Sequence, residues 1–295
     1  MLSMTFEEAV APINVAISEA RPFSLIRLGD SENSILGYPE HTKEPRIQSV
    51  LSRLMDAREY SPAEVLDIKS GLVEAVNGAD IVGLFPADHP KELCALSPAV
   101  LQSAGVQIEL TCWQSIHFYL AASGHLARMV YAADRVTLIT GRDIKARFDE
   151  RFGCDVEQLL VPSERKFRLN EENGRGEHYP TVYRAILAVI EVRAPRHLFL
   201  VGAGVLGKAY CQAIKEAGGI AVDVGSVFDY WAGLATREKK TPADQVVADG
   251  IATNLKSAKS GLGLDDTPSK MSVLREVYWQ GFNPPDLRRG GPSAA

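Results

Sequence analysis

Two carboxylates near the front of the chain have the residue types and spacing that suit a metal ion. Asp30 and Glu32 stand two positions apart, directly after the apolar run 23–28. In extended or turn backbone, both side chains can reach one small cation. Carboxylate oxygens suit hard ions such as Mg²⁺ or Mn²⁺, which keep several waters and take further ligands from a phosphate-bearing substrate. The segment therefore predicts a metal site. The competing interpretation is a polar turn in which Arg27 pairs with a carboxylate.

A second candidate site is the glycine-rich segment Gly202-x-Gly204-x-x-Gly207, with Asp223 at the end of the next expected strand. This spacing matches the dinucleotide-binding fingerprint, in which glycines allow close approach to a pyrophosphate and the acid binds a ribose. One hypothesis is therefore an NAD(P)- or FAD-dependent oxidoreductase. Only one further strand is predicted after this segment, however, whereas a full dinucleotide fold has about six strands in two halves. The helix start at 204–208 can still hold a phosphate, or the glycines serve only strand–helix packing.

Strands and helices alternate along the chain up to about residue 235. Apolar runs predict strands at 23–28, 81–85, 106–110, 136–140, 156–161, 197–201 and 220–224. Helices are predicted at 5–17, 47–54, 61–78, 113–133 with a break at Gly124, 144–148, 180–192 and 207–218. Two of these begin with a capping box, Thr5 with Glu8 and Ser61 with Glu64. The alternation predicts an α/β fold with a Rossmann-like, mostly parallel sheet and helices on both faces.

The pattern weakens beyond residue 236, which predicts two parts. We expect an α/β domain over 1–235 and a helical or loop-rich C-terminal extension over 236–295, partly disordered, with one helix at 271–279.

Composition narrows the class of protein. A chain of 295 residues with 46% hydrophobic residues can bury a large core, and its net charge of -5 argues against general nucleic-acid binding. The first residues lack a signal-peptide pattern, and no apolar run approaches the roughly 20 residues of a transmembrane helix. The four cysteines form no C-x-x-C pair and are typical of a reducing compartment. We expect a cytoplasmic protein without nucleic-acid partners.

Taken together, these segments resemble the GT-D-type glycosyltransferases, bacterial enzymes with a Rossmann-like sheet and a D-x-E metal motif. The matching segments are 26–32, where the family typically reads R-x-G-D-G-E, and 138–141, 161–162 with Phe167, 200–204 and 220–226. Ser31 departs from the usual glycine but leaves both carboxylates in place. The resemblance implies a nucleoside-diphosphate sugar as donor, first of all a UDP-sugar. It also implies Mn²⁺ or Mg²⁺ held by Asp30 and Glu32, as a Lewis acid on the leaving diphosphate.

The same resemblance suggests roles for residues at other strand ends. The residues expected to line the donor site are Arg27, Gly29, Gly141, Arg142, Lys166, Gly202 and Gly204. For Arg142 and Lys166, a plain surface cation is the competing interpretation. The first candidate for the general base is Asp229, which follows the last strand, and the alternatives are Asp88 and His89. Tyr230 and Trp231 are candidates for stacking on a sugar or base, or for core packing.

The sequence thus predicts a metal-dependent, hexosyltransferase-like glycosyltransferase that acts on a glycan or other hydroxyl acceptor, with polysaccharide biosynthesis as the implied context. Two alternatives stay open: the oxidoreductase with the 202–207 segment, and a non-catalytic nucleotide-sugar-binding module. The identity of the sugar, the acceptor and the oligomeric state are open as well, a homo-oligomer being one option.

Overall fold

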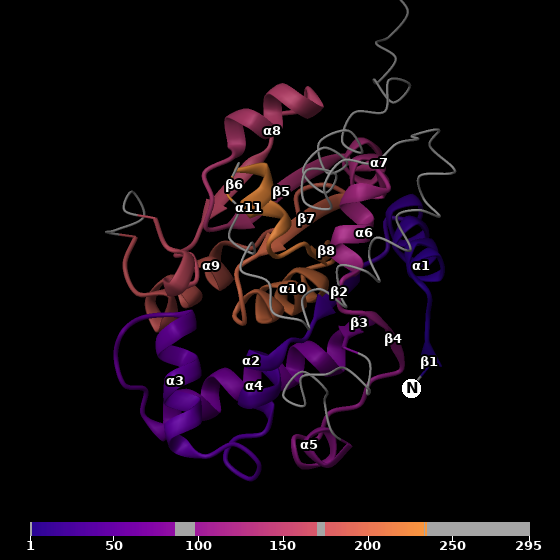
Figure 1. The fold of residues 1–295 in the computed structure, drawn as a ribbon. Coiled ribbons are helices and arrows are strands. Elements are labelled where there is room, and N and C mark those ends of the chain that lie inside the picture. The colour runs from indigo at the N-terminus through magenta and orange to yellow at the C-terminus, as the bar shows by residue number, and fades with distance from the viewer. Residues whose placement is uncertain (1, 86–97, 170–174, 233, 235–295) are drawn as a thin grey trace, which may run out of the picture.

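The structure is a computed structural model that describes residues 2–85, 98–169, 175–232 and 234. Within these residues, eight parallel strands form one sheet in the order β1-β4-β3-β2-β8-β7-β5-β6 (Figure 1). The strands are β1 (Leu2–Ser3), β2 (Phe23–Arg27), β3 (Ile81–Leu84), β4 (Leu110–Trp113), β5 (Arg135–Thr140), β6 (Glu157–Leu160), β7 (His197–Gly202) and β8 (Ile220–Asp223). The predicted Rossmann-like parallel sheet is confirmed.

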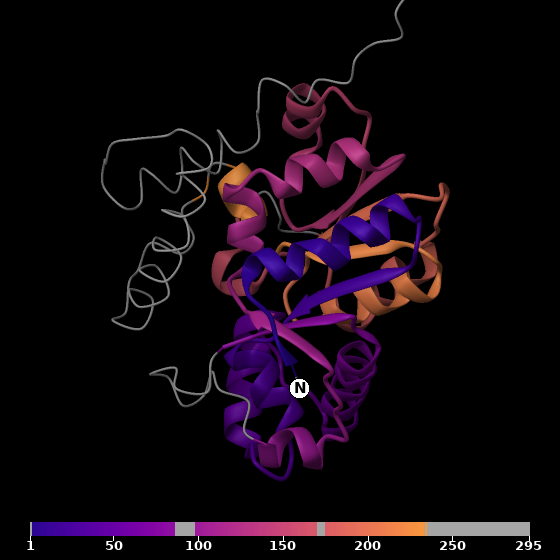
Figure 2. The same cartoon turned by 90° about the vertical axis from the view of Figure 1, so that its right-hand side faces the viewer.

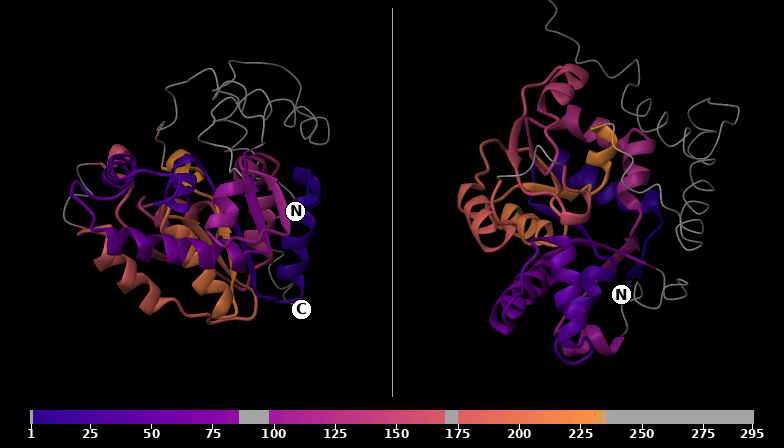
Figure 3. Two further views of the ribbon diagram at one scale, coloured as in Figure 1. Left: turned by 90° about the horizontal axis from the view of Figure 1, so that it is seen from below. Right: turned by 60° about the vertical axis from the view of Figure 1, so that its left-hand side comes forward.

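Strand β8 joins the N-terminal strands β1 to β4 to the later strands β5 to β7. It lies between β2 and β7, so that Leu25 pairs with Val222 and Val201 pairs with Asp223. Every residue of β2 and β8 is buried, as expected for strands covered on both faces. Figure 3 shows the indigo-to-purple N-terminal part beside the orange part of the chain.

Helices cover both faces of the sheet. One face carries α1 (Phe6–Ser18), α6 (Ile116–Ala122), α7 (His125–Ala132), α8 (Lys145–Phe152) and α11 (Val227–Trp231). The other carries α2 (Asp30–Leu36), α3 (Glu44–Leu54), α4 (Pro62–Gly78), α9 (Tyr183–Val189) and α10 (Gly207–Glu216). Figure 2 shows α1 beside α6 and α7. Shorter pieces are α5 (Pro98–Ser103), a 3₁₀ turn η1 (Arg165–Phe167) and a π-turn η3 (His178–Val182).

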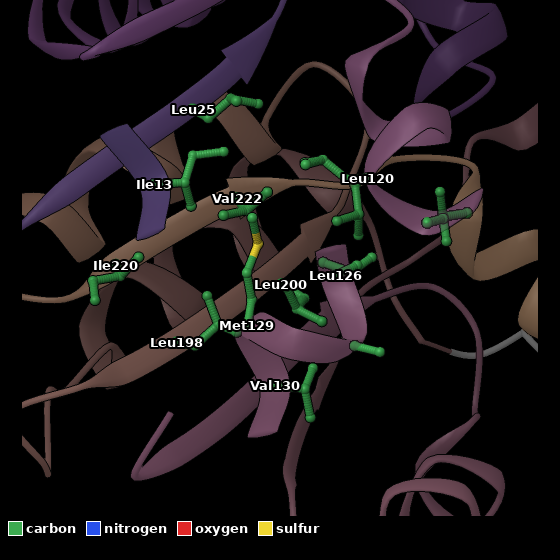
Figure 4. Packing of buried hydrophobic residues seen from close by; sticks show 14 of the residues in the cluster. Ile13, Leu25, Leu120, Leu126, Met129, Val130, Leu198, Leu200, Ile220 and Val222 are labelled. Atoms are coloured by element: carbon green, nitrogen blue, oxygen red, sulfur yellow. The ribbon is translucent and has the colours of Figure 1, made fainter. Parts of the chain in front are cut away.

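The two faces have separate apolar cores because strand side chains alternate between them. Leu25, Leu200 and Val222 pack with Ile13 and Met129 on the α1 and α7 side, as Figure 4 shows. Their neighbours along the strands, such as Ile26 and Val201, pack on the α4 and α10 side instead. This burial on both faces is what gives the strands their nearly continuous apolar sequence.

Most predicted boundaries agree with the structure, and both capping boxes are present. The strand predicted at 106–110 is wrong in its bounds. Strand β4 lies at 110–113, where Thr111 and Cys112 are buried and pair with β3. The exposed Gln107 and Glu109 keep the preceding stretch out of the sheet. The helix predicted from 113 is also shorter, because Trp113 belongs to β4 and α6 begins at Ile116. Gly124 separates α6 from α7 with a φ of 75°, as predicted.

The connections at the carboxyl edge leave toward opposite faces. Strands β2 and β7 lead into α2 and α10 on one face, whereas β8 and β5 lead into α11 and α8 on the other. In open α/β sheets, ligands bind at such a switch point. A ligand site is therefore expected at the carboxyl ends of β2, β8, β7 and β5. In the described part of the chain, no helix has both the length and the apolar character needed to cross a bilayer.

Some predictions fall outside the described residues. They include Asp88, His89, the extension at 236–295 with its helix at 271–279, and therefore the division of the chain at 235.

Candidate active site

The end of β2 is tied to the end of β8 by Arg27. Its Nη2 lies 2.9 Å from Oδ1 of Asp223, and its Nε donates to the carbonyl oxygen of Asp223 at 3.1 Å. Its Nη1 lies 3.0 Å from the imidazole of His117 on α6. A Cβ on Gly225 would lie 2.0 Å from Nη2, so the turn after β8 closes directly over the guanidinium. The structure thus places Arg27 in a buried network between two strand ends.

Lys208, the second residue of α10, brings Glu32 into the same network. Its Nζ lies 2.9 Å from Oε1 of Glu32 and 3.2 Å from Oδ2 of Asp223, and it donates to the carbonyl oxygen of Gly204 at 3.0 Å. The other oxygen of Glu32 accepts the Gly29 N–H at 2.9 Å. We call Arg27, Glu32, Lys208 and Asp223 the buried ion cluster. It holds two positive and two negative side chains.

The pKa values in the cluster follow from its charges. Burial would raise the pKa of Glu32 and of Asp223, but the neighbouring cations outweigh it and both pKa values lie below their usual range. For Lys208, burial would lower the pKa, but Asp223 and Glu32 raise it to about 12. All three groups therefore stay charged near neutral pH.

Asp30 lies in a different environment from Glu32. It is the first residue of α2, its side chain is 47% exposed, and Nη2 of Arg53 lies 3.8 Å from Oδ2. The expectation of extended or turn backbone at 30–32 is wrong, because Gly29 is the N-cap and helix α2 begins at Asp30. Residues two apart on a helix project about 200° apart. The two carboxylates therefore have separate neighbours.

This arrangement defines what the site can offer a metal ion. Among the described residues, no group of three or more His, Cys, Asp and Glu side chains is placed to hold one. Asp30 fits a hard cation that takes its other ligands from water and a substrate's phosphates, since Mg²⁺ often uses one or two carboxylates in this way. Both oxygens of Glu32 already have partners within the protein.

The structure brings two other predicted residues together as an ion pair. Nε of Arg142, after β5, lies 2.7 Å from Oδ1 of Asp229 on α11. Nη2 of Arg142 also donates to the carbonyl oxygen of Phe167 at 2.9 Å. Both side chains are largely buried, so Arg142 holds the Asp229 carboxylate in one place at the carboxyl edge. The neighbouring Trp231 is buried among Phe148 and other rings, which agrees with core packing.

Gly141, after β5, packs against the segment that follows β6, and Lys166 belongs to that segment. A Cβ on Gly141 would lie 2.0 Å from Oγ of Ser163, so the chain passes too close for a larger residue. Lys166 is partly exposed, with its Nζ 3.0 Å from Oε2 of Glu164 and 4.7 Å from the ring centre of Phe167.

Gly202 and Gly207 of the glycine-rich segment are needed for the chain's own packing. A Cβ on Gly202 would lie 2.4 Å from Cδ2 of Phe228, and one on Gly207 would lie 3.2 Å from a methyl group of Val201. Gly204 has a φ of 60°, in the left-handed region that favours glycine. Asp223, the expected ribose ligand of a dinucleotide site, is buried in its pairs with Arg27 and Lys208. The geometry therefore does not favour the oxidoreductase alternative.

The side chains of Lys208 and His117 belong to the buried network at the site but were not predicted from the sequence. For Lys208 there was a signal: a lysine in the first turn of the helix after a glycine-rich loop, with two acids at other strand ends. His117 has no comparable signal, because only the packing of α6 against the sheet brings it to Arg27.

The structure is that of an α/β protein whose candidate site lies at the carboxyl ends of its parallel strands. The GT-D fold-like domain family matches residues 4–231, and the chain belongs to this family. It is accordingly a glycosyltransferase, as the resemblance predicted, and the family points to a nucleotide-sugar donor and a glycan acceptor.

Two further comparisons complete this result. No curated protein matches the chain. Among solved structures, it is similar to a selenomethionine-substituted structure of domain of unknown function 1792. That match has 14% sequence identity and a TM-score of 0.46, and it covers 82% of this chain and 85% of the other.

Proposed function

We propose that this glycosyltransferase moves a sugar from a nucleoside-diphosphate sugar, first of all a UDP-sugar, to a hydroxyl group of a glycan-type acceptor. The reaction would take place at the carboxyl edge of β2, β8, β7 and β5. One observation carries the proposal. The D-x-E segment and the glycine-rich segment, far apart in the sequence, meet at this edge through Lys208, whose Nζ lies 2.9 Å from Oε1 of Glu32 and 3.0 Å from the carbonyl oxygen of Gly204.

The donor diphosphate would lie beside Asp30 and the start of α10. Partial positive charge at the N-terminus of α10 favours a phosphate near Gly204. Asp30 would hold Mn²⁺ or Mg²⁺, which when bound stabilises negative charge on the leaving diphosphate. Arg53 is a partly exposed cation near Asp30 and would add to this positive environment. Lys166 is a second candidate cation: it is partly exposed, and its Nζ pairs with Glu164, whose carboxylate lies beside Gly204.

For the proton of the acceptor hydroxyl, we propose Asp229 as general base. It lies after β8, and Arg142 fixes the direction of its carboxylate through the 2.7 Å contact. A base must stand within hydrogen-bond reach of the proton it takes, so a fixed carboxylate at the ligand edge suits this role. Asp88 and His89 stay predictions from the sequence.

Ligand binding and turnover test this proposal. We expect UDP or GDP with Mn²⁺ to raise the melting temperature, and EDTA or the substitution Asp30→Asn to abolish that rise. Asp155→Asn is a matched control, because the Asp155 side chain is 95% exposed and precedes β6, at the opposite edge of the sheet. Nucleotide release from a panel of UDP- and GDP-sugars, with and without glycan acceptors, then measures transfer.

Each alternative has its own outcome. Binding of the nucleotide without release from any donor would instead indicate a sugar-nucleotide-binding module. A metal-independent rise in the melting temperature with NAD(H) or NADP(H) would support the oxidoreductase hypothesis instead. Equal effects of Asp30→Asn and Asp155→Asn would remove Asp30 from the donor site.

A further inference from the structure

We infer that Glu32 is a positioning residue paired with Lys208, and that Asp30 is the one carboxylate of the D-x-E pair that contacts a divalent ion. This inference rests on the proposed function, because it assigns different tasks to the two acids of its motif. Glu32 and Asp30 differ in their contacts, in their burial and in the charges around them, and the inference rests on these differences.

The oxygens of Glu32 already have good partners. Oε1 lies 2.9 Å from Nζ of Lys208, Oε2 accepts the N–H of Gly29 at 2.9 Å, and the side chain is 10% exposed. The Asp30 side chain is 47% exposed, and its nearest cation is Arg53 at 3.8 Å, beyond hydrogen-bond distance. Water and a phosphate-bearing ligand can therefore approach Asp30 far more easily than Glu32.

The charges around Glu32 oppose a metal ion there. A divalent ion bound to Oε1 would stand next to the ammonium of Lys208, with the guanidinium of Arg27 bonded to the neighbouring Asp223. Repulsion between cations is strong in a buried environment because the effective dielectric constant is low. To admit the metal, Lys208 would have to give up a buried ion pair, and its ammonium would keep Asp223 as its carboxylate partner.

The Glu32–Lys208 pair instead fixes the relative positions of three strand-end segments. Lys208 lies in the first turn of α10 and contacts Gly204 in the glycine-rich turn, Asp223 at the end of β8, and Glu32 in the first turn of α2. Asp30 stands two residues before Glu32 on the same helix. The pair therefore sets where the Asp30 carboxylate lies relative to the glycine-rich turn, at which we place the donor phosphates.

A double-variant cycle tests this assignment without measuring turnover. The proteins are the wild type, Glu32→Leu, Lys208→Met and the double variant, in which neither new side chain can bind a hard metal ion. Glu32→Gln, which keeps an oxygen acceptor, is a second single variant in case Glu32→Leu does not fold. The measurements are the melting temperature without ligands and the affinity for Mn²⁺ in the presence of UDP, from the electron paramagnetic resonance signal of free Mn²⁺.

We expect each single variant to melt about 10 °C below the wild type, because each leaves an uncompensated buried charge. The double variant removes one charge of each sign and should recover at least half of that loss. Because two apolar side chains can pack in place of the buried ion pair and keep α2 against α10, the double variant should also keep its Mn²⁺ affinity within about threefold of the wild type. Asp30→Asn should weaken Mn²⁺ binding by roughly 10-fold or more, with a melting temperature within about 2 °C of the wild type.

Two results would overturn the inference. The first is a double variant that recovers its melting temperature, and so its packing, but binds Mn²⁺ with UDP as weakly as Asp30→Asn, since Glu32 would then be a ligand. The second is strictly additive melting shifts, since the two side chains would then not be paired. If the wild type binds no Mn²⁺ with UDP or GDP, the metal part of the proposed function fails, while the melting cycle still decides whether Glu32 is held by Lys208.

Discussion

Replacing Gly202 by alanine asks whether the glycine-rich segment serves the fold or a ligand. The added Cβ would lie 2.4 Å from Cδ2 of Phe228 and 2.8 Å from the carbonyl oxygen of Gly225. The Phe228 ring is 1% exposed in the core, and the second obstacle is backbone, so neither can swing away. Overpacking a core typically costs about 1–3 kcal/mol, and two such contacts put this substitution at about 2–3 kcal/mol. For a chain of this size, that corresponds to a melting temperature lower by roughly 4–12 °C.

Urea unfolding at 25 °C, followed by circular dichroism, measures this free energy. Gly204→Ala is the control: its Cβ would lie 3.4 Å from Oε1 of Glu164, an ordinary contact, so the cost is mainly that of a φ of 60°. We estimate that cost at about 1–2 kcal/mol. Our reasoning about the segment is wrong if Gly202→Ala is as stable as the wild type. A stable Gly202→Ala protein that loses binding of a nucleotide would show that the glycine makes room for a ligand.

Three further predictions concern Asp229, Arg27 and His178. Asp229→Asn should lower kcat by about 10²- to 10⁴-fold with little change in donor affinity, and unchanged kcat would exclude it as the base. Arg27→Met should lower the free energy of unfolding by about 3–5 kcal/mol, since it breaks the buried pair with Asp223, and a loss below 1 kcal/mol in urea would contradict this. Burial lowers the pKa of His178 to about 3 from 6.5, so the unfolded chain binds the extra proton as the pH falls below 6.5. Stability should therefore fall by about 2 kcal/mol between pH 7.5 and pH 5 from this residue, and His178→Asn should show a flatter pH dependence.

Secondary structure was predicted best where the residues that determine an element are neighbours in the sequence. Thr5 with Glu8 begins α1, and Ser61 with Glu64 begins α4, because a capping box needs only neighbouring residues. Long apolar runs such as 136–140 were recognisable as strands because both faces of the sheet are covered. The strand at 106–110 was misplaced, since the sequence there alternates in polarity and only pairing with β3 selects residues 110–113.

Part of the candidate site could be predicted because the D-x-E and glycine-rich segments are short motifs of neighbouring residues. Both segments follow parallel strands, so they lie at the same edge of the sheet. The backbone of 30–32 was wrongly expected to be extended or a turn, because a glycine N-cap with a glutamate three residues later also starts a helix. The sequence carried a signal for Lys208 but not for its pairing with Glu32, since the two side chains meet only because β8 lies between β2 and β7.

The sequence by itself determined the alternation of strands and helices, the family, and the types of side chain available at each strand end. These depend on hydrophobic periodicity and short motifs, which are properties of neighbouring residues. Only the tertiary structure decided which charges meet: Arg27 with Asp223, Lys208 with Glu32, and Arg142 with Asp229. The physical reason is that an ion pair depends on distance and burial. Strand order and helix packing set both across long stretches of the chain.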